Sequence, residues 1–372
     1  MKFKIAILLL VVILSTAVLS GCSFTDIAEQ PAEETLEENK TAEEKADRQL
    51  SKEEREEKKE ELKEQYADDA FQQPTEEGGI FAGQSPFTGE MLKEIQYKHA
   101  VSVSIENSPA ARPQSGLESA EIVYEFMLEG GITRFLAFFW PNVPEKVGPI
   151  RSARPFLIDV AKSYDSLFLH AGASPDGFKR LSDSGILHLD QIYQSQYFWR
   201  SSKRLAPHNL YSGKIPLQDF TAELDQIEYP NRFKFLTASI MSNPQKAEEI
   251  TIDYWGDYSV NYRYDEEVNI YHRFLYDFET PHRVESGRQL SAKNIIVQYT
   301  DTEIKDDAGR LEMNLNKGGK ALFFRDGIVI SGSWQKNGDS WISYYDKNGS
   351  ELEMNPGQTW IQVVPDDTEI KY

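Results

Sequence analysis

The sequence predicts an α+β fold, in which an α/β-type mixed-sheet domain over residues 86–243 is followed by a mostly antiparallel β domain over residues 248–372. Two observations support this prediction. In the first region, apolar runs typical of strands are interleaved with segments of helical spacing. In the second region, short β-branched and aromatic runs follow one another and are separated by turn pairs such as Asp326-Gly327.

The amino-acid composition limits the kinds of function and site that the protein can have. The 372 residues are 40% hydrophobic, which is enough to bury sizeable cores. The formal charge of -20 argues against a nucleic acid partner, because phosphates would be repelled. The single cysteine excludes an intramolecular disulfide and a multi-cysteine metal site.

The first 22 residues read as a signal peptide. Lys2 and Lys4 precede an apolar run over residues 5–19, which ends in Leu19-Ser-Gly-Cys22. This ending resembles the lipobox of bacterial lipoproteins, which implies that Cys22 is lipidated, with palmitate, and becomes the mature N-terminus. We therefore expect a protein anchored through Cys22 to the outer face of the bacterial cell membrane. In the alternative, a chance cysteine in a transmembrane anchor, the rest of the chain still lies outside the cytoplasm.

Residues 23–85 are predicted to form an acidic, low-complexity tether. They contain mostly Glu, Lys, Ala and Gln, and they carry more than half of the excess negative charge. Opposite charges four residues apart, such as Glu54 and Lys58, favour a partly helical spacer that holds the folded part away from the membrane. A partner-binding helix is the alternative.

The first folded elements are a half-buried strand over residues 99–105, a loop over residues 106–117 that contains Arg112, and a β-hairpin. The hairpin strands, residues 120–128 and 132–140, are joined by Gly130-Gly131, which predicts a two-residue loop with Glu129 facing Ile132. That register places Arg134 opposite Met127, and diagonal to Glu125 and Glu129. A salt-bridged sheet face and a binding site explain this pattern equally.

Two further arginines precede a predicted helix. Arg151 and Arg154 lie in the loop over residues 148–154, and Ser152 is the predicted N-cap, with Pro155 in the first turn. The macrodipole disfavours cations at a helix N-terminus. An anion bound at the same helix end would stabilise them, and so would pairing with the glutamates of the hairpin.

The rest of the first domain contains a buried strand over residues 166–170, a second helix and a polar loop. Ser174 is the predicted N-cap of this helix, with Pro175 in its first position. His170 ends the strand, and His208 and Asn209 lie in the loop over residues 200–211.

The second domain is predicted to be a small antiparallel sheet or barrel. We interpret its large aromatic residues as core rather than as a ligand platform, and we interpret His272 and His282 as structural or surface residues. The predicted strands are residues 250–254, 259–264, 268–275, 293–299, 320–325, 328–334 and 359–364. The aromatic residues are Trp255, Phe323, Phe324, Trp334 and Trp360.

Five blocks, in this order, resemble the signature of the YerB-like lipoproteins of Gram-positive bacteria. They are Asn107-Ser-Pro-Ala-Ala-Arg-Pro-Gln-Ser-Gly, Glu129-Gly-Gly-Ile-Thr-Arg-Phe-Leu-Ala, Gly148-Pro-Ile-Arg-Ser-Ala-Arg, His170-Ala-Gly-Ala-Ser-Pro and Ala206-Pro-His-Asn-Leu-Tyr. The resemblance covers residues 86–372 and implies an N-terminal and a C-terminal family domain on a lipid-anchored chain. It is a family of unknown function, so it implies no catalytic residues.

The candidate site residues favour binding over catalysis. Arginine forks recognise carboxylates and phosphates in a bidentate manner. We therefore predict a non-enzymatic binding or accessory module of the cell envelope, with a site for an anionic wall component or a partner protein. The candidate ligand-binding residues are Arg112, Arg134, Arg151, Arg154, His170, His208 and Asn209.

An extracytoplasmic hydrolase or transferase acting on the cell wall or another polyanion is the alternative. It would use Ser174 with His170 or His208, but Ser174 does not lie in a Gly-x-Ser-x-Gly elbow. Zinc ligation by His170, His188 and His208 lacks any short ligand motif, so no metal and no cofactor is predicted.

Overall fold

The computed structural model describes residues 83–92, 98–236, 244–254 and 258–372. The signal peptide with Cys22, the charged tether and Trp255 lie outside these residues. Within the described part, no helix is both long enough and apolar enough to cross a membrane.

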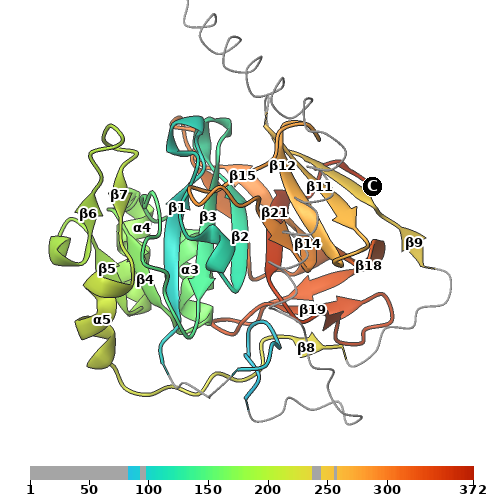
Figure 1. Ribbon diagram of the computed structural model, residues 1–372, viewed down its shortest axis with the longest axis horizontal. Coiled ribbons are helices and arrows are strands. Elements are labelled where there is room, and N and C mark those ends of the chain that lie inside the picture. The colour runs from blue at the N-terminus through green and yellow to red at the C-terminus, as the bar shows by residue number, and fades with distance from the viewer. Residues whose placement is uncertain (1–82, 93–97, 237–243, 255–257) are drawn as a thin grey trace, which may run out of the picture. The chain divides into compact units, whose positions relative to one another are not determined.

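A mixed sheet of 11 strands dominates the fold, in the order β19-β18-β17-β14-β21-β2-β3-β1-β4-β5, with β9 added beside β18 (Figure 1). Its strands from the first region are β1 (Val101–Glu106), β2 (Ile122–Met127), β3 (Thr133–Phe139), β4 (Leu167–His170) and β5 (His188–Asp190). Its strands from the second region are β9 (Gln245–Lys246), β14 (Asn294–Thr300), β17 (Gly319–Arg325), β18 (Ile328–Gln335), β19 (Ser343–Asp346) and β21 (Thr359–Pro365).

The sheet is continuous across the two regions that the sequence predicts as separate domains. Strand β21, near the end of the chain, lies parallel to both β14 and β2, with Val123 and Ile295 both paired to Trp360. Trp360 is fully buried, and its ring meets that of Phe135 from β3 edge-on at 5.4 Å. The hydrophobic core therefore extends through both regions.

The register predicted for the central hairpin is wrong by one residue. The connection between β2 and β3 contains the three-residue 3-10 turn η3 (Glu129–Gly131), and the Leu128 N–H donates to the Ile132 carbonyl at 2.8 Å. A shift of one residue moves every side chain to the other face. Arg134 consequently lies opposite Phe126 rather than Met127, on the face away from Glu125.

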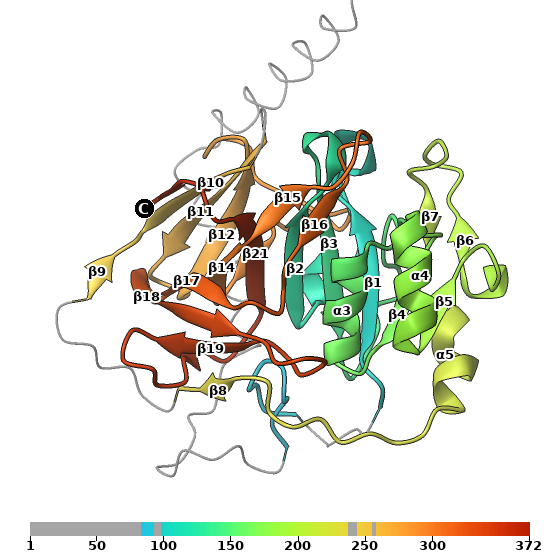
Figure 2. The same cartoon turned by 180° about the vertical axis from the view of Figure 1, so that it is seen from behind.

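The three α-helices among the described residues belong to the first region: α3 (Pro155–Ser163), α4 (Pro175–Ser184) and α5 (Lys214–Ala222). Figure 2 shows α3 and α4 side by side in front of β1 and β4. The residue at the N-cap of α3 is Arg154, with Pro155 in the first position, so the prediction of Ser152 as N-cap is wrong. Ser174 caps α4 as predicted, because its Oγ accepts from the Gly177 N–H at 3.1 Å.

A second, antiparallel sheet of five strands has the order β13-β12-β11-β10-β22. Its strands are β10 (Glu249–Asp253), β11 (Ser259–Asp265), β12 (Ile270–Leu275), β13 (Ser291–Ala292) and β22 (Ile370–Lys371). This sheet agrees with the predicted antiparallel character of the second region. The predicted two-residue turn at Asp326-Gly327 is also found, and it joins β17 to β18 in the main sheet.

Short elements complete the fold. The two-stranded sheets pair β6 (Trp199–Arg200) with β7 (Leu210–Tyr211), β8 (Lys234–Phe235) with β20 (Glu353–Met354), and β15 (Thr302–Ile304) with β16 (Leu311–Met313). Besides η3 (Glu129–Gly131), the described residues form the 3-10 turns η1 (Pro109–Ala111), η2 (Leu117–Ser119) and η4 (Ser195–Tyr197). As predicted, Phe323, Phe324, Trp334 and Trp360 are buried core residues.

Candidate functional site

One edge of the main sheet collects most of the sequence-predicted site residues. Strands β1, β4 and β5 are parallel, so their carboxyl ends meet at this edge, where α3 and α4 also begin. In open α/β sheets, this is the edge at which ligands bind. The segment of residues 148–154 runs along it: the Arg151 N–H donates to the Ser104 carbonyl, and the Ala153 N–H to the Gly172 carbonyl, both at 2.9 Å.

Three arginines converge at the start of α3, and we call them the arginine cluster: Arg134, Arg151 and Arg154. Arg134 comes from β3 and donates through Nη1 to the Ser152 carbonyl at 2.7 Å. Arg154 forms an ion pair with Glu129 of the hairpin turn. Arg151 points its Nε at the Glu106 carboxylate, 3.4 Å away. Pairing with a hairpin glutamate thus holds for Arg154, whereas Glu125 lies on the other face of the hairpin.

The cluster carries more positive than negative charge. Two carboxylates, Glu106 and Glu129, accompany the three guanidinium groups. Arg134 is only 4% exposed, and burial, followed by repulsion from Arg154 and Arg151, lowers its pKa to about 9. Within the described residues, the buried Nε atoms of Arg134 and Arg151 have no hydrogen-bond partner. The helix start has no side-chain cap either. The arrangement can therefore accept an anion.

A carboxylate–imidazole pair lies beside the cluster. Glu106, at the end of β1, is 2% exposed, and His208 Nδ1 lies 3.0 Å from both of its carboxylate oxygens. Ser108 Oγ donates to the same carboxylate at 2.8 Å. Because a carboxylate accepts, His208 Nδ1 is the donor, and Nε2 is the acceptor nitrogen in the neutral form of this half-buried ring. Such a pair can act as a general base.

His170 and Ser174 have other partners. His170 Nδ1 lies 2.9 Å from the Gly172 carbonyl, and its Nε2 lies 3.0 Å from His188 Nδ1. A carbonyl only accepts, so His170 is protonated on Nδ1 and accepts from His188 on Nε2. Burial lowers the pKa of His170 to about 4, which keeps the ring neutral at pH 7. Ser174 Oγ is the cap of α4, so the described contacts join neither residue to His208.

Asn209 and Arg112 hold loops in place. Asn209 Nδ2 donates to the carbonyls of Ser201 and Arg204 at 3.0 and 3.1 Å, which closes the loop that carries His208. Arg112 Nε donates to Asn107 Oδ1 at 3.0 Å, and its Nη1 donates to the Tyr276 hydroxyl at 2.6 Å. Arg112 thus connects the first region to Tyr276, the residue that follows β12, rather than joining the arginine cluster.

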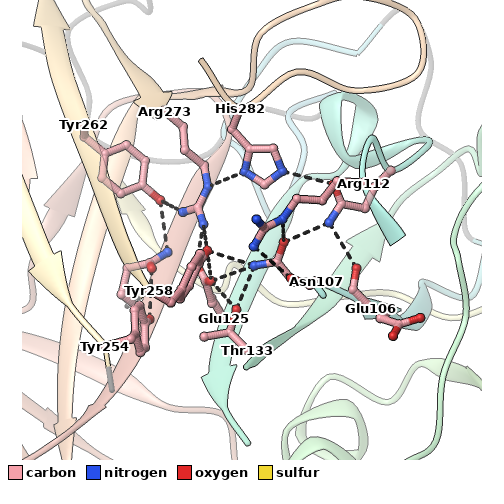
Figure 3. Close-up of polar contacts among 12 residues, drawn as sticks. Glu106, Asn107, Arg112, Glu125, Thr133, Tyr254, Tyr258, Tyr262, Arg273 and His282 are labelled. Carbon is pink, nitrogen blue, oxygen red and sulfur yellow. Dashed lines mark hydrogen bonds and ion pairs between the residues drawn. The ribbon is translucent and has the colours of Figure 1, made fainter. Parts of the chain in front are cut away.

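Next to Arg112 lies a fully buried ion pair between Glu125 of β2 and Arg273 of β12 (Figure 3). Arg273 Nη2 donates to Glu125 Oε2 at 2.7 Å, and neither side chain is exposed to solvent. Burial alone would lower the pKa of Arg273, but Glu125 together with Tyr262, Tyr258 and Tyr254 outweighs that effect and raises it. Asn107 Nδ2 and the Tyr258 hydroxyl donate to Glu125 Oε1 at 3.2 and 2.9 Å.

The same polar network extends through His282 to the backbone of Glu106, whose carboxylate accompanies the arginine cluster. Arg273 Nε donates to His282 Nδ1, and His282 Nε2 donates to Gln114 Oε1, both at 3.0 Å (Figure 3). Burial lowers the pKa of His282 well below its usual value, so the ring is neutral. Gln114 Nε2 in turn donates to the Glu106 carbonyl at 3.0 Å. As predicted, His282 is structural.

Sequence patterns alone indicated no site role for Glu106, Asn107, Gln114, Glu125 or Arg273. Asn107 and Gln114 lie in one of the five signature blocks, which was a usable signal. Arg273 interrupts a strand of large apolar residues, which was another signal, because a charge in a core strand requires a partner. No three His, Cys, Asp or Glu residues of the described chain lie close enough together to hold a metal ion.

Comparison with known proteins identifies the family. Residues 87–228 match "Protein of unknown function (DUF3048) N-terminal domain", and residues 250–361 match the DUF3048 C-terminal domain. The "Putative lipoprotein YerB" of Bacillus subtilis (strain 168) is 33% identical over 292 residues, which cover 76% of this chain and 86% of that protein.

The fold also matches a solved structure. The crystal structure of YerB protein from Bacillus subtilis superposes with a TM-score of 0.68 and 33% identity, over 78% of this chain and 99% of that chain. The arginine cluster lies within the N-terminal match, and the Glu125–Arg273 pair connects the two matches. The chain therefore belongs to the YerB-like, two-part DUF3048 family, whose function is unknown.

Proposed function

We propose that this protein is an extracytoplasmic, membrane-anchored lipoprotein that binds an anionic group of the cell envelope at the arginine cluster, without chemical turnover. The anion is carried by a wall component or by the surface of a partner protein. The anchor is a palmitate-bearing lipid on Cys22, supported by the Leu-Ser-Gly-Cys ending of the signal peptide and by the lipoprotein name of the relative.

The observation that supports this function best is the unsatisfied positive charge at the start of α3. Arg134 is buried beside Arg151 and Arg154, which lowers its pKa, and its Nε lacks a partner among the described residues. A bound anion would supply that partner and relieve the repulsion between the guanidinium groups. Glu106 and Glu129 position Arg151 and Arg154 for this role but do not neutralise all three.

Thermal unfolding of the full chain with inorganic phosphate, acetate and soluble muropeptides would test the proposal. Ligand binding to the native state raises the midpoint. We expect at least one of these anions to raise it in the parent and not in an Arg151→Ala/Arg154→Ala double variant. The matched control is Lys179→Ala, which removes an exposed cation of α4 outside the cluster and should keep the full shift. A shift that persists in the double variant would refute the assignment.

A second candidate function is hydrolysis or group transfer, and the Glu106–His208 pair is the observation that favours it. A buried carboxylate that fixes one imidazole nitrogen leaves the other available as a general base, and the neighbouring arginines could stabilise a developing oxyanion. Turnover of a wall fragment by the parent, abolished in His208→Ala and retained in Lys179→Ala, would establish this function in place of simple binding.

A further inference from the structure

A separate cavity of about 450 Å³ lies in the second region, and we call it the C-terminal cleft. One wall is the face of the main sheet around Tyr299, Leu322 and Ser331, where Leu322 and Ser331 face each other across β17 and β18. The other wall is the chain segment over residues 366–372. This volume is in the range of small-molecule sites.

The cleft is preformed, because both ends of its outer wall are anchored. The segment leaves β21 of the main sheet at Pro365 and enters the second sheet as β22, where Ile370 pairs with Ile252. The ring of the following Tyr372 meets Phe324 edge-on at 5.4 Å. A ligand would therefore bind here with little loss of backbone entropy.

Two tyrosines give the cleft aromatic surface. Tyr299 is half-buried and Tyr372 is 43% exposed, so both rings present surface to the cavity that they line. They lie close enough to interact electrostatically, since burial and, after it, Tyr372 raise the pKa of Tyr299. Aromatic faces of this kind pack against the apolar C–H faces of ring-shaped ligands.

Polar groups of both signs line the rest of the cleft. Lys320 lies on one wall, and Asp366, Asp367 and Thr368 lie on the other. In the described part of the chain, Lys320, Asp366 and Asp367 form no ion pair, although Lys317, which pairs with Asp301 at 2.9 Å, also attracts Asp366 electrostatically. Lys320 and Asp367 therefore offer a donor and acceptors that are free for a ligand.

The chemistry of these walls selects the ligand class. Two carboxylates and one ammonium group line the cleft, so its charge disfavours an anionic ligand, whereas the charge of the arginine cluster favours one. A purely apolar ligand would leave the charged groups of the cleft without partners. An uncharged molecule with many hydroxyl or amide groups could hydrogen-bond to the polar groups of the cleft, and its apolar ring face could pack against the two tyrosines. We propose that the C-terminal cleft binds a short uncharged saccharide, at a site independent of the arginine cluster.

Isothermal titration of the full chain with N,N′-diacetylchitobiose, cellobiose and spermidine would test this proposal. We expect at least one of the two saccharides to bind the parent. Its dissociation constant should rise about tenfold or more in Tyr372→Ala and in Asp367→Asn, each of which removes one kind of contact. The matched control, Glu369→Gln, changes an exposed residue of the same segment that does not line the cleft, and it should bind as the parent does.

Three outcomes would overturn the proposal. They are binding of neither saccharide, binding of spermidine alone, and equal weakening by Glu369→Gln and Asp367→Asn. If Tyr372→Ala fails to fold, which circular dichroism would reveal, Asp367→Asn still decides the result, because Asp367 is an exposed side chain outside the core.

Discussion

At the scale of single residues, the Glu125–Arg273 pair shows that the partner of one charged side chain decides which partners remain for its neighbours. The predicted hairpin register placed Glu125 near Arg134, but Glu125 instead pairs with Arg273 of the second region, supported by Asn107 and Tyr258. Desolvation of both charges is costly, and the pair is stable only because hydrogen bonds satisfy the remaining polar atoms. Arg134 is therefore left with the Ser152 carbonyl and, through Nε, with no described partner.

Breaking this pair should be strongly destabilising. We expect Glu125→Gln to lower the free energy of unfolding by about 3–5 kcal/mol, because it leaves the Arg273 charge buried and uncompensated. Urea denaturation of the full chain would measure the change. Lys179→Ala, which breaks the exposed pair with Asp183, should change it by less than about 1 kcal/mol.

A double variant separates the charge effect from a packing effect. If the loss in Glu125→Gln comes from an unpaired buried cation, Glu125→Gln combined with Arg273→Met should recover part of the stability. A Glu125→Gln protein within about 1 kcal/mol of the parent would contradict the assigned role of the pair.

At the scale of elements, turns determined which side chains meet. The Gly130-Gly131 pair marked the hairpin correctly, but the turn η3 has three residues, and the extra residue moved Arg134 to the other face. At Asp326-Gly327, by contrast, two residues with φ of 54° and 68° connect β17 to β18, as such a pair predicts.

This second turn provides a test of close packing. Gly327→Ala should lose more stability than Gly338→Ala, although both glycines have positive φ. A Cβ at position 327 would lie 2.7 Å from carbons of the Tyr264 ring, whose hydroxyl is hydrogen-bonded to Asn269, whereas position 338 is open. The backbone strain of about 1–2 kcal/mol is common to both. Equal midpoints of thermal unfolding for the two variants would show that the ring moves aside freely.

At the scale of the whole molecule, the two family regions share one sheet. Strand β21 lies between β14 and β2, so the second region supplies the neighbour of a strand in the first. The Glu125–Arg273 pair and the Trp360–Phe135 contact add buried interactions across the same boundary. The match to the N-terminal domain alone therefore covers only part of one continuous sheet.

A fragment of residues 86–243 should not fold by itself. Without β21, one edge of β2 loses its backbone hydrogen bonds, and Glu125 loses Arg273. We expect no cooperative thermal transition by circular dichroism and little dispersion in its amide proton spectrum, whereas a fragment of residues 83–372 should unfold cooperatively. A single sharp transition in the shorter fragment would mean that the first region is an independent domain.

The sequence by itself determined the fold class, most strands of both regions, the Ser174 cap and the Asp326-Gly327 turn. These features depend on patterns within a few residues, where period-two alternation and turn chemistry act locally. It also named Arg134, Arg151 and Arg154 in one candidate site, but that set included Arg112, which has other partners in the structure.

Only the tertiary structure decided which strands are neighbours and which charges pair. Alternation specifies which face of a strand is buried, but not which distant strand lies beside it, so the place of β21 could not be read from the chain. The partners of Glu125 and Glu106 were hidden for the same reason: Arg273 and His208 are remote in sequence. They meet these carboxylates only when the sheets and loops assemble, because a buried charge is stable wherever the completed fold supplies its counter-charge.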